Sequence, residues 1–166
     1  MHIRPVNHTD ADMLFTFFEQ LDRETNFLLF EPGERIPSRQ QQEIRLQQIL
    51  EGDSERMWVV TDEQLISGYL GLRRGNVRRN RHAAIIAMGL LQSCCGQGWG
   101  AKLLQHAESW ARGHQIHRLG LTVMTHNERA LRLYQKQGFV IEGLQKDSLL
   151  VNGTYVDEYL MAKILT

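Results

Sequence analysis

The stretch SCCGQGWGAKLL, residues 93–104, decides the fold, because three alternating glycines join an apolar run to a helical pattern. Glycine loses more conformational freedom on ordering than any other residue, so Gly96, Gly98 and Gly100 need a specific reason. A helix N-terminus offers unpaired N–H groups and a partial positive charge, which suit a phosphate group. A tight strand-to-helix turn without a ligand is the simpler alternative. Three alternate glycines favour anion binding, because the missing Cβ atoms let an anion approach the backbone.

Patterns on both sides of this stretch predict strands and helices in alternation. The run 83–91 is almost entirely apolar, which is typical of a strand covered on both faces. The apolar residues of 103–111 share one helical stripe. Asn127 is placed to cap a further helix, Gly138 to end it and Asn152-Gly153 to close a hairpin. The other predicted elements are strands at 2–6, 57–61, 65–72, 119–124, 139–144, 148–151 and 155–164, and helices that begin after Thr9 or Asp10 and after Ser38.

The bulk composition is that of an ordinary globular domain. The chain has 166 residues, of which 42% are apolar and 23% charged, and a formal net charge of zero. This balance argues against nucleic acid and membrane surfaces as partners, and no apolar run approaches the roughly 20 residues that span a bilayer. The first residues, MHIRPVNHTDADML, lack the apolar core of a signal peptide. Cys94 and Cys95 are adjacent, which suits no ordinary disulfide, so we expect a cytoplasmic protein with reduced thiols.

Two common phosphate-binding motifs can be tested against the glycines. A P-loop requires Gly-Lys-Ser/Thr, whereas Lys102 follows Ala101 and precedes Leu103. The dinucleotide pattern G-x-G-x-x-G/A is formally met by Gly96, Gly98 and Ala101. It also requires an acidic residue about 20 residues later, and the segment HRLGLTVMT contains none. The sequence therefore disfavours a nicotinamide or flavin enzyme.

The apolar strand, the glycine loop and the elements after them resemble the GNAT superfamily of acyl-CoA-dependent N-acetyltransferases. That family carries Arg/Gln-x-x-Gly-x-Gly/Ala in this loop, and Gly98-Trp99-Gly100 matches its core. The family's downstream Asn, Ala, Tyr, Gly and Phe correspond to Asn127, Ala130, Tyr134, Gly138 and Phe139. The stretch VNGTYVDEYLMAKIL is similar to the branch that holds ribosomal-protein N-terminal and amino-acid N-acetyltransferases. The resemblance implies an α/β (α+β) fold in one domain, residues 1–166, with a mixed central sheet of six to seven strands and about four helices.

The resemblance also implies a site for acetyl-CoA as co-substrate, without a metal. The loop that would hold the pyrophosphate comprises Cys95, Gly96, Gln97, Gly98, Trp99, Gly100 and Ala101. Cys95 stands where the family has Arg or Gln, so one side-chain contact is missing. On the preceding strand, Met88, Gly89 and Leu90 would bind the pantetheine arm, with Gly89 at a bulge or a close approach of the backbone. A small residue chosen for packing is the alternative for Gly89.

Two catalytic roles follow from the same resemblance. The Leu90 N–H would stabilise the developing oxyanion, and Tyr134 would protonate the leaving thiolate. For Tyr134 the alternative is a core aromatic with its hydroxyl on a backbone group. Asn127 would contact the coenzyme arm in addition to capping its helix.

No general base can be carried over, because Thr122 stands where some relatives have a glutamate. Glu31 and Glu34, in the irregular segment 24–37 that forms the acceptor lip in such folds, and Glu158 are candidates, although surface carboxylates are the simpler interpretation. Deprotonation through ordered water is an equal alternative.

The implied reaction moves an acetyl group to a primary amine by direct attack in a ternary complex. The acceptor is a small molecule, such as an amino acid or a polyamine, or a protein N-terminus. A non-catalytic acyl-CoA-binding or sensing module is the alternative from another class. The oligomeric state stays open, a homodimer included.

Three remaining features are interpreted as structural. The cysteine pair fits small residues at a strand end better than a ping-pong nucleophile, because no neighbouring base or cation is evident. His114 and His117 lack the further ligands that a metal site needs. The arginines of 73–81 fit a solvated hairpin tip, with contact to RNA or an acidic partner as the weaker alternative.

Overall fold

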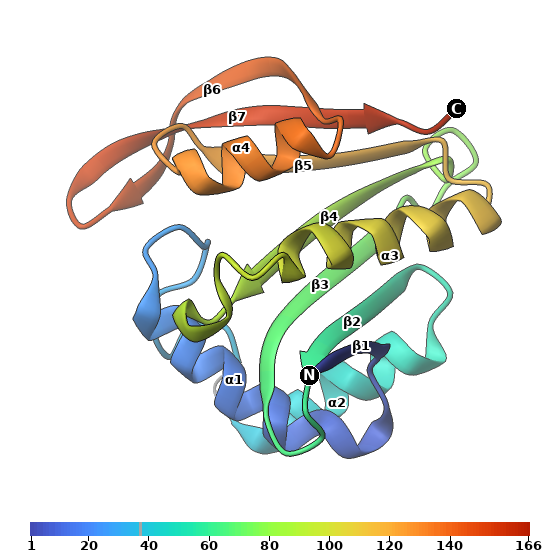
Figure 1. The fold of residues 1–166 in the computed structure, drawn as a ribbon, viewed down its shortest axis with the longest axis vertical. Coiled ribbons are helices and arrows are strands. Elements are labelled where there is room, and N and C mark those ends of the chain that lie inside the picture. The colour runs from blue at the N-terminus through green and yellow to red at the C-terminus, as the bar shows by residue number, and fades with distance from the viewer. Residues whose placement is uncertain (37) are drawn as a thin grey trace.

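The computed structural model describes residues 1–36 and 38–166, and these form one mixed sheet of seven strands with helices on both faces (Figure 1). The strands are β1 His2–Pro5, β2 Glu55–Thr61, β3 Ile66–Arg74, β4 Ala83–Leu90, β5 Arg118–Met124, β6 Val140–Val151 and β7 Thr154–Ile164. The helices are α1 Ala11–Glu24, α2 Arg39–Glu51, α3 Trp99–Gly113 and α4 Glu128–Lys136, with 3-10 turns η1 His8–Asp10 and η2 Gln92–Cys94. The expected α/β architecture is confirmed.

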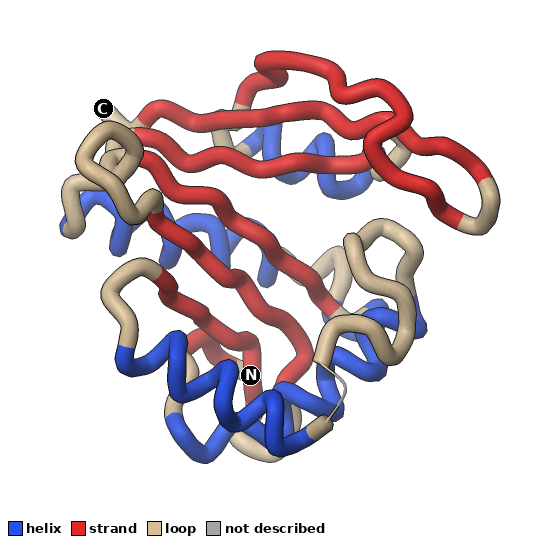
Figure 2. Tube along the Cα trace, turned by 180° about the vertical axis from the view of Figure 1, so that it is seen from behind, coloured by secondary structure: helices blue, strands red, loops and turns tan. Residues whose placement is uncertain are grey.

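The sheet opens between its two parallel strands. The strand order is β1-β2-β3-β4-β5-β7-β6, and β4 and β5 are the only parallel neighbours among the described residues. These two strands pair only at their beginnings, from Ala83 opposite Arg118 to Ile85 opposite Gly120. Beyond this point they diverge, and Figures 1 and 2 show the two halves of the sheet spread apart like a V. Among the described residues, no strand therefore pairs with the second half of β4 on its β5 side.

Two apolar cores lie on opposite faces of the sheet. On one face, α3 and α4 pack against side chains such as Leu70, and Figure 1 shows both helices in front of the strands. On the other face, α1 and α2 pack against side chains such as Val59. Leu103 of α3 and Phe17 of α1 are almost fully buried, and burial of such a side chain contributes about 1.5–3 kcal/mol. These apolar helix faces hold the strand ends and the loop at residues 93–98 in place.

The prediction that the strand at 83–91 is covered on both faces is wrong. Ile85 is 60% exposed and Ala87 is also exposed, whereas Ala84 and Ile86 are buried. On this open face α1 reaches only the end of β4, where Leu21 lies against Gly89. One face of the middle of β4 is therefore open, because the helix layer stops short of it.

Most local signals act as the sequence indicates. The Asn127 side chain accepts from the Ala130 N–H, and Ser38 accepts from the Gln41 N–H. Gly138 has φ +87, as expected of a residue that ends a helix in the left-handed region. The hairpin between β6 and β7 turns at Asn152-Gly153, with φ 50 and 77.

Two local predictions differ from the structure. The first cap is Asn7, whose side chain accepts from the Thr9 N–H at the start of η1, whereas neither Thr9 nor Asp10 makes a cap bond to α1. The Asp10 carboxylate instead accepts from Arg4 and from the Asn7 N–H. The two stretches predicted at 139–144 and 148–151 form the single strand β6, with a register irregularity between Gln145 and Leu149.

Candidate functional site

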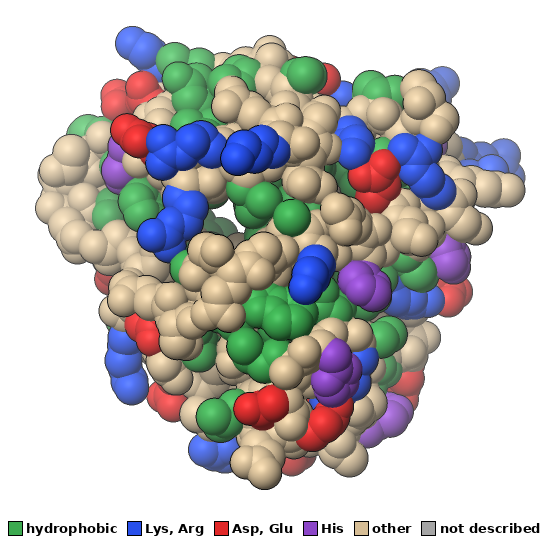
Figure 3. Space-filling view, viewed as in Figure 1, with side chains coloured by type: hydrophobic (Ala, Val, Ile, Leu, Met, Phe, Trp, Pro, Cys, Tyr) green, Lys and Arg blue, Asp and Glu red, His purple; other side chains and the backbone are tan. Residues whose placement is uncertain are grey.

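The loop between β4 and α3 presents a row of unused backbone donors. Within the described chain, no acceptor pairs with the N–H groups of Gly96 through Ala101, and the first helical bond runs from Lys102 to Gly98. The row stands at the N-terminus of a 15-residue helix, whose dipole adds partial positive charge. Figure 3 shows a hollow on this face between α3 and α4, with Lys and Arg side chains on its rim. Adjacent free donors in this setting suit a group with several anionic oxygens, such as a pyrophosphate.

The three glycines of the loop serve two different purposes. Gly96 and Gly98 have φ +77 and +83, and a Cβ on either would meet nothing within 4 Å. A Cβ on Gly100 would lie 2.8 Å from Leu133 Cδ2 and 3.2 Å from Met88 Cε. Gly96 and Gly98 therefore shape the loop and leave open space in front of it. Gly100 instead lets α3 approach α4 closely.

The side chains of the loop add one cation. The Lys102 ammonium lies 4.4 Å from the centroid of the Trp99 ring. Gln97 Nε2 donates to Ser93 O at 2.7 Å, which braces the loop. Cys95 Sγ contacts Leu90 O at 3.8 Å, so it offers no charged group at the position where the resembling family carries Arg or Gln. A ligand at this loop would therefore meet backbone N–H groups and the Lys102 ammonium.

The hydrogen-bond alternation of β4 directs two residues toward the opening in the sheet. The Leu91 N–H donates to β3, and bonded and non-bonded pairs alternate along an antiparallel ladder. Gly89 is therefore bonded to β3, whereas the N–H and C=O groups of Met88 and Leu90 point away from it. Because β4 and β5 no longer pair at this level, no strand in the described part of the chain pairs with these groups. An extended chain could bind there as an additional strand would.

Gly89 is explained by packing rather than by a bulge. The register between β3 and β4 is regular, so the expected bulge is absent. A Cβ at this position would lie 2.7 Å from Leu21 Cδ2 and 3.2 Å from Tyr69 Cε1. The glycine lets α1 approach the sheet, and its own backbone groups are directed to β3.

Sequence reasoning missed the matching edge of β5. The Thr125 N–H donates to Asp157 O in β7. The same alternation therefore directs the backbone groups of Thr122 and Met124 toward β4. No sequence signal marks these backbone groups. The same residues in a continuous parallel sheet would have their backbone groups paired, and the sequence does not distinguish the two cases.

Tyr134 lies on α4 and is only 8% exposed. Its ring packs edge-on against Phe139 at 5.9 Å between centroids. Within the described chain its hydroxyl has no hydrogen-bond partner, so the alternative of a hydroxyl held by a backbone group is not seen there. Burial, with a smaller effect of the Tyr69 phenol, raises the pKa of Tyr134 well above its ordinary value. The phenol therefore stays protonated at neutral pH and can act as a donor.

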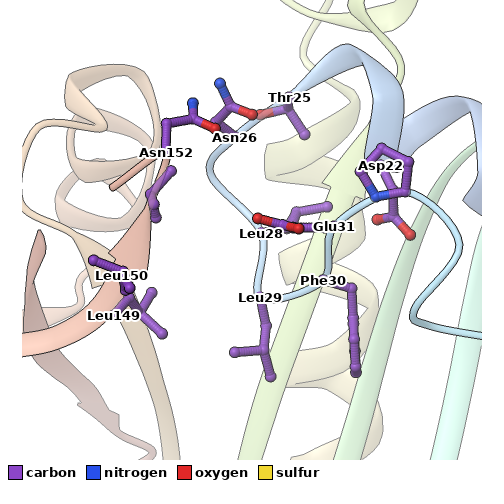
Figure 4. Close-up of a pocket in the computed structure, with 12 residues that line it drawn as sticks. Asp22, Thr25, Asn26, Leu28, Leu29, Phe30, Glu31, Leu149, Leu150 and Asn152 are labelled. Atoms are coloured by element: carbon purple, nitrogen blue, oxygen red, sulfur yellow. The ribbon is translucent and has the colours of Figure 1, made fainter. Parts of the chain in front are cut away.

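A cavity of about 270 Å³ lies between the α1–α2 segment and the β6–β7 hairpin (Figure 4). We call residues 24–36 the lip; Pro37, which the predicted acceptor lip included, lies outside the described residues. The apolar side chains that line the cavity are Leu28, Leu29, Phe30, Pro32, Leu149, Leu150 and Val151. The polar ones are Asp22, Thr25, Asn26, Glu31 and Asn152. Figure 4 shows the labelled side chains coming from the end of α1 and the lip on one side and from the hairpin on the other.

The lip contacts both halves of the opened sheet. Just after β4, the Gln92 N–H donates to Glu24 Oε2 at 2.7 Å, and Gln92 Nε2 donates to Glu24 O at 2.9 Å. In the turn between β5 and α4, the His126 ring lies 5.1 Å from the Phe27 ring. The cavity is thus held beside the carboxyl ends of β4 and β5, where ligands bind in α/β sheets.

Of the three carboxylates considered as bases, only Glu31 lines the cavity. Glu34 Oε2 accepts from the Glu31 N–H at 2.8 Å, and Glu158 Oε2 accepts from Ser148 Oγ at 2.9 Å. The Glu31 carboxylate accepts from no described group.

Sequence reasoning also missed a buried ion pair beside the cavity. Arg35 Nη2 and Nε donate to the two oxygens of Asp22 at 2.8 and 3.1 Å. The guanidinium lies over the rings of Phe18 and Phe30, at 4.7 and 4.8 Å from their centroids, and Nη1 is 3.5 Å from the Tyr69 hydroxyl. The two partners are 13 residues apart across an irregular segment, so no periodic pattern connects them.

The remaining features agree with structural roles. Cys94 is buried, and this burial raises its pKa, which is the opposite of an activated nucleophile. His114 stacks on the Trp110 ring at 3.9 Å and contacts its carbonyl oxygen. Arg78 and Arg79 are exposed at the tip between β3 and β4. No helix in the described parts of the chain is both long enough and apolar enough to cross a membrane.

Comparisons with known proteins place this geometry in a family. Residues 16–139 match the family model described as Acetyltransferase (GNAT) family. The chain is 40% identical over 63 residues to the L-amino acid N-acetyltransferase AaaT of Escherichia coli (strain K12), which covers 38% of this chain and 37% of that protein. It is 34% identical over 87 residues to the [ribosomal protein uS5]-alanine N-acetyltransferase of the same organism, which covers 52% of this chain and 45% of that protein. The chain therefore spans less than half the length of these two curated relatives.

A solved structure matches over nearly the whole chain. The GNAT-family acetyltransferase from Streptococcus pneumoniae is 30% identical, with 99% of both chains covered and a TM-score of 0.92. With its diverging parallel strands, its loop of free amides and the family model matched over most of its length, the chain belongs to the GNAT acetyltransferase family.

Proposed function

We propose that this chain transfers the acetyl group of acetyl-CoA to a primary amine by direct attack in a ternary complex. The observation that carries the proposal is the row of free N–H groups from Gly96 to Ala101, next to a strand edge left open at Met88 and Leu90. The relatives support the acceptor chemistry, since one is named for acetylating L-amino acids and another for acetylating an alanine of a ribosomal protein. In both cases the acceptor group is an amine.

The open groups fit the successive parts of the coenzyme. The amides of Gly96 to Ala101 bind the pyrophosphate at the N-terminus of α3, with Lys102 as a nearby cation. The pantetheine arm runs along β4 and bonds the backbone groups of Met88 and Leu90 as a further strand would. Asn127 uses its side-chain oxygen for the helix cap, and its side-chain amide N–H groups are available to the coenzyme arm.

The chemical step then needs few groups from the protein. The amine nitrogen attacks the thioester carbon, a C–N bond forms, and the negative charge on the carbonyl oxygen is stabilised by the Leu90 N–H. The C–S bond breaks, and the sulfur takes a proton from the Tyr134 phenol, which is later restored from solvent. The surplus proton of the attacking nitrogen leaves to the Glu31 carboxylate or to water.

Two measurements on the purified chain test the proposal. Isothermal titration with acetyl-CoA measures binding, and a free-thiol assay follows release of CoA with amino acids, polyamines, aminoglycosides and N-terminal peptides as acceptors. The proposal predicts binding together with thiol release that depends on the acceptor. Binding without release across the whole panel would support the non-catalytic acyl-CoA-binding or sensing module. A cytoplasmic location stays a prediction from the sequence, and the oligomeric state stays open.

A further inference from the structure

The cavity under the lip carries negative charge without positive charge. The described residues that line it include the carboxylates of Asp22 and Glu31 and no Lys, Arg or His. Glu31 accepts from no described group, so its charge is uncompensated. A ligand that places a carboxylate here would meet a like charge, and no cation from the described lining would balance it.

The cations near the cavity are already engaged or lie outside it. Arg35 directs Nε and Nη2 to Asp22 and is enclosed by aromatic rings, and it lines a separate small pocket rather than this cavity. It therefore neutralises Asp22 and not a ligand. His126 contacts Phe27 and does not line the cavity, and Lys146 of the hairpin does not line it either.

The rest of the lining suits neutral polar groups and an apolar side chain. Asn26 and Asn152 each offer an amide N–H donor and a carbonyl acceptor, which is the pairing that a peptide bond requires. Leucine side chains from the lip and the hairpin form the walls, and they suit a small or apolar side chain. The cavity therefore matches an amine that is followed by a peptide bond.

The protonation state of the acceptor gives an independent argument. A peptide α-amine has a pKa of about 7.7 and a lysine-type alkyl amine about 10.4, so near pH 7.5 roughly a third of the former is neutral against roughly 0.1% of the latter. In a free amino acid the adjacent carboxylate favours the charged ammonium form. Glu31 is the single candidate base that the described lining supplies, and it is exposed. A site with only one exposed candidate base favours an acceptor whose amine is already partly neutral at about pH 7.5, which is the peptide α-amine.

We infer that the acceptor is the α-amine of a peptide, and that the lip cavity selects it against free amino acids by lacking a partner for their carboxylate. This inference rests on the proposed acetyl transfer. It names the peptide N-terminus as the acceptor class and Glu31 as the charge that discriminates.

Matched acceptors test it with the intact chain and acetyl-CoA. The free-thiol assay is run with L-alanine, L-alaninamide, an alanine-leading tetrapeptide amide and spermidine. We expect kcat/KM to be at least about tenfold higher for alaninamide than for alanine, because the carboxylate of alanine is repelled in the cavity and also keeps more of its amine protonated. The Glu31→Gln variant separates these two effects. We expect the tetrapeptide amide to exceed alaninamide, and spermidine to be the poorest amine.

Two variants make the test specific to the cavity. Glu31→Gln removes the repelling charge and should narrow the ratio between alaninamide and alanine several-fold, whereas Glu43→Gln, an exposed change on α2, should leave the ratio unchanged. Leu150→Lys places a cation on the hairpin side of the cavity and should raise kcat/KM for alanine, with Leu150→Gln as its neutral control.

The outcomes separate this inference from the proposed function. Thiol release that favours alanine over alaninamide, or spermidine over the peptide, would overturn the inference while acetyl transfer stands. If no acceptor in the panel leads to thiol release, the proposed function itself is overturned. An unchanged alaninamide-to-alanine ratio in Glu31→Gln would remove Glu31 from the selection and overturn the assignment of its charge.

Discussion

Replacing Gly98 with alanine tests whether the loop at residues 93–98 binds acetyl-CoA, because the expected effect on the unfolding free energy is small and the expected effect on the Kd is large. Gly98 has φ +83, and a Cβ there would meet nothing within 4 Å, so the cost comes from the backbone alone. The left-handed conformation costs a non-glycine residue about 1–2 kcal/mol, and the stiffer unfolded chain offsets about 0.4–1 kcal/mol of this. The net loss of unfolding free energy is therefore about 1 kcal/mol, which for a chain of this size lowers the Tm by about 2–4 °C.

The same methyl group should weaken coenzyme binding far more than it weakens the fold. The added Cβ would occupy open space beside the free amides, and we expect the pyrophosphate to use that space. Loss of one or two charge-assisted hydrogen bonds, worth about 1.5–3 kcal/mol each, raises the Kd for acetyl-CoA by at least about tenfold in isothermal titration.

Gly153→Ala is the matched control for this prediction. Gly153 has φ +77 and open space at its Cβ, but it lies in the β6–β7 hairpin away from the loop. We expect Gly153→Ala to lose about as much unfolding free energy as Gly98→Ala and to leave the Kd for acetyl-CoA unchanged. If Gly98→Ala binds acetyl-CoA as tightly as the unchanged protein, the loop amides do not hold the coenzyme.

Three further predictions concern the buried groups. Tyr134→Phe should lower kcat at least about 100-fold in the thiol assay and leave the Kd for acetyl-CoA unchanged, and near-normal turnover would remove Tyr134 from the mechanism. Burial raises the pKa of Tyr134 and Tyr69, so their contribution to stability is complete below about pH 10 and is lost as pH rises through the folded-state pKa. Urea unfolding should therefore show a fall in unfolding free energy as pH rises above about 10, and the fall should be smaller in Tyr134→Phe. An equal fall in both proteins would contradict this. Asp22→Asn leaves the Arg35 guanidinium without its buried partner and should cost about 3 kcal/mol in urea unfolding, a loss below about 1 kcal/mol arguing against a buried pair.

The features that the sequence predicts correctly depend on short stretches of chain. The Asn127 cap, the left-handed Gly138 and the Asn152-Gly153 turn each arise from one residue and its immediate neighbours. For the same reason the glycine loop could be assigned to a helix N-terminus. The sequence could not show that Gly96 and Gly98 face open space whereas Gly100 is packed. Gly100 is required by Leu133, which lies on another helix.

The features that the sequence misses depend on distant contacts. Gly89 is required by Leu21, 68 positions earlier in the chain, and no local pattern records that approach. The exposure of Ile85 depends on where a separate layer of helices ends. The free edge at Thr122 exists only because two parallel strands diverge, which their apolar sequences do not signal.

Transfer of the acetyl group itself is the most direct test of the account. The purified chain is incubated with acetyl-CoA and a peptide bearing a free α-amine, and mass spectrometry measures acetylation of the peptide while the thiol assay measures CoA. The account predicts one acetyl group on the peptide amine for each thiol released, with the rates of both signals lowered by the same factor in Tyr134→Phe. Tight binding of acetyl-CoA with no acetylated amine, for this peptide or for any acceptor in the panel, would contradict it.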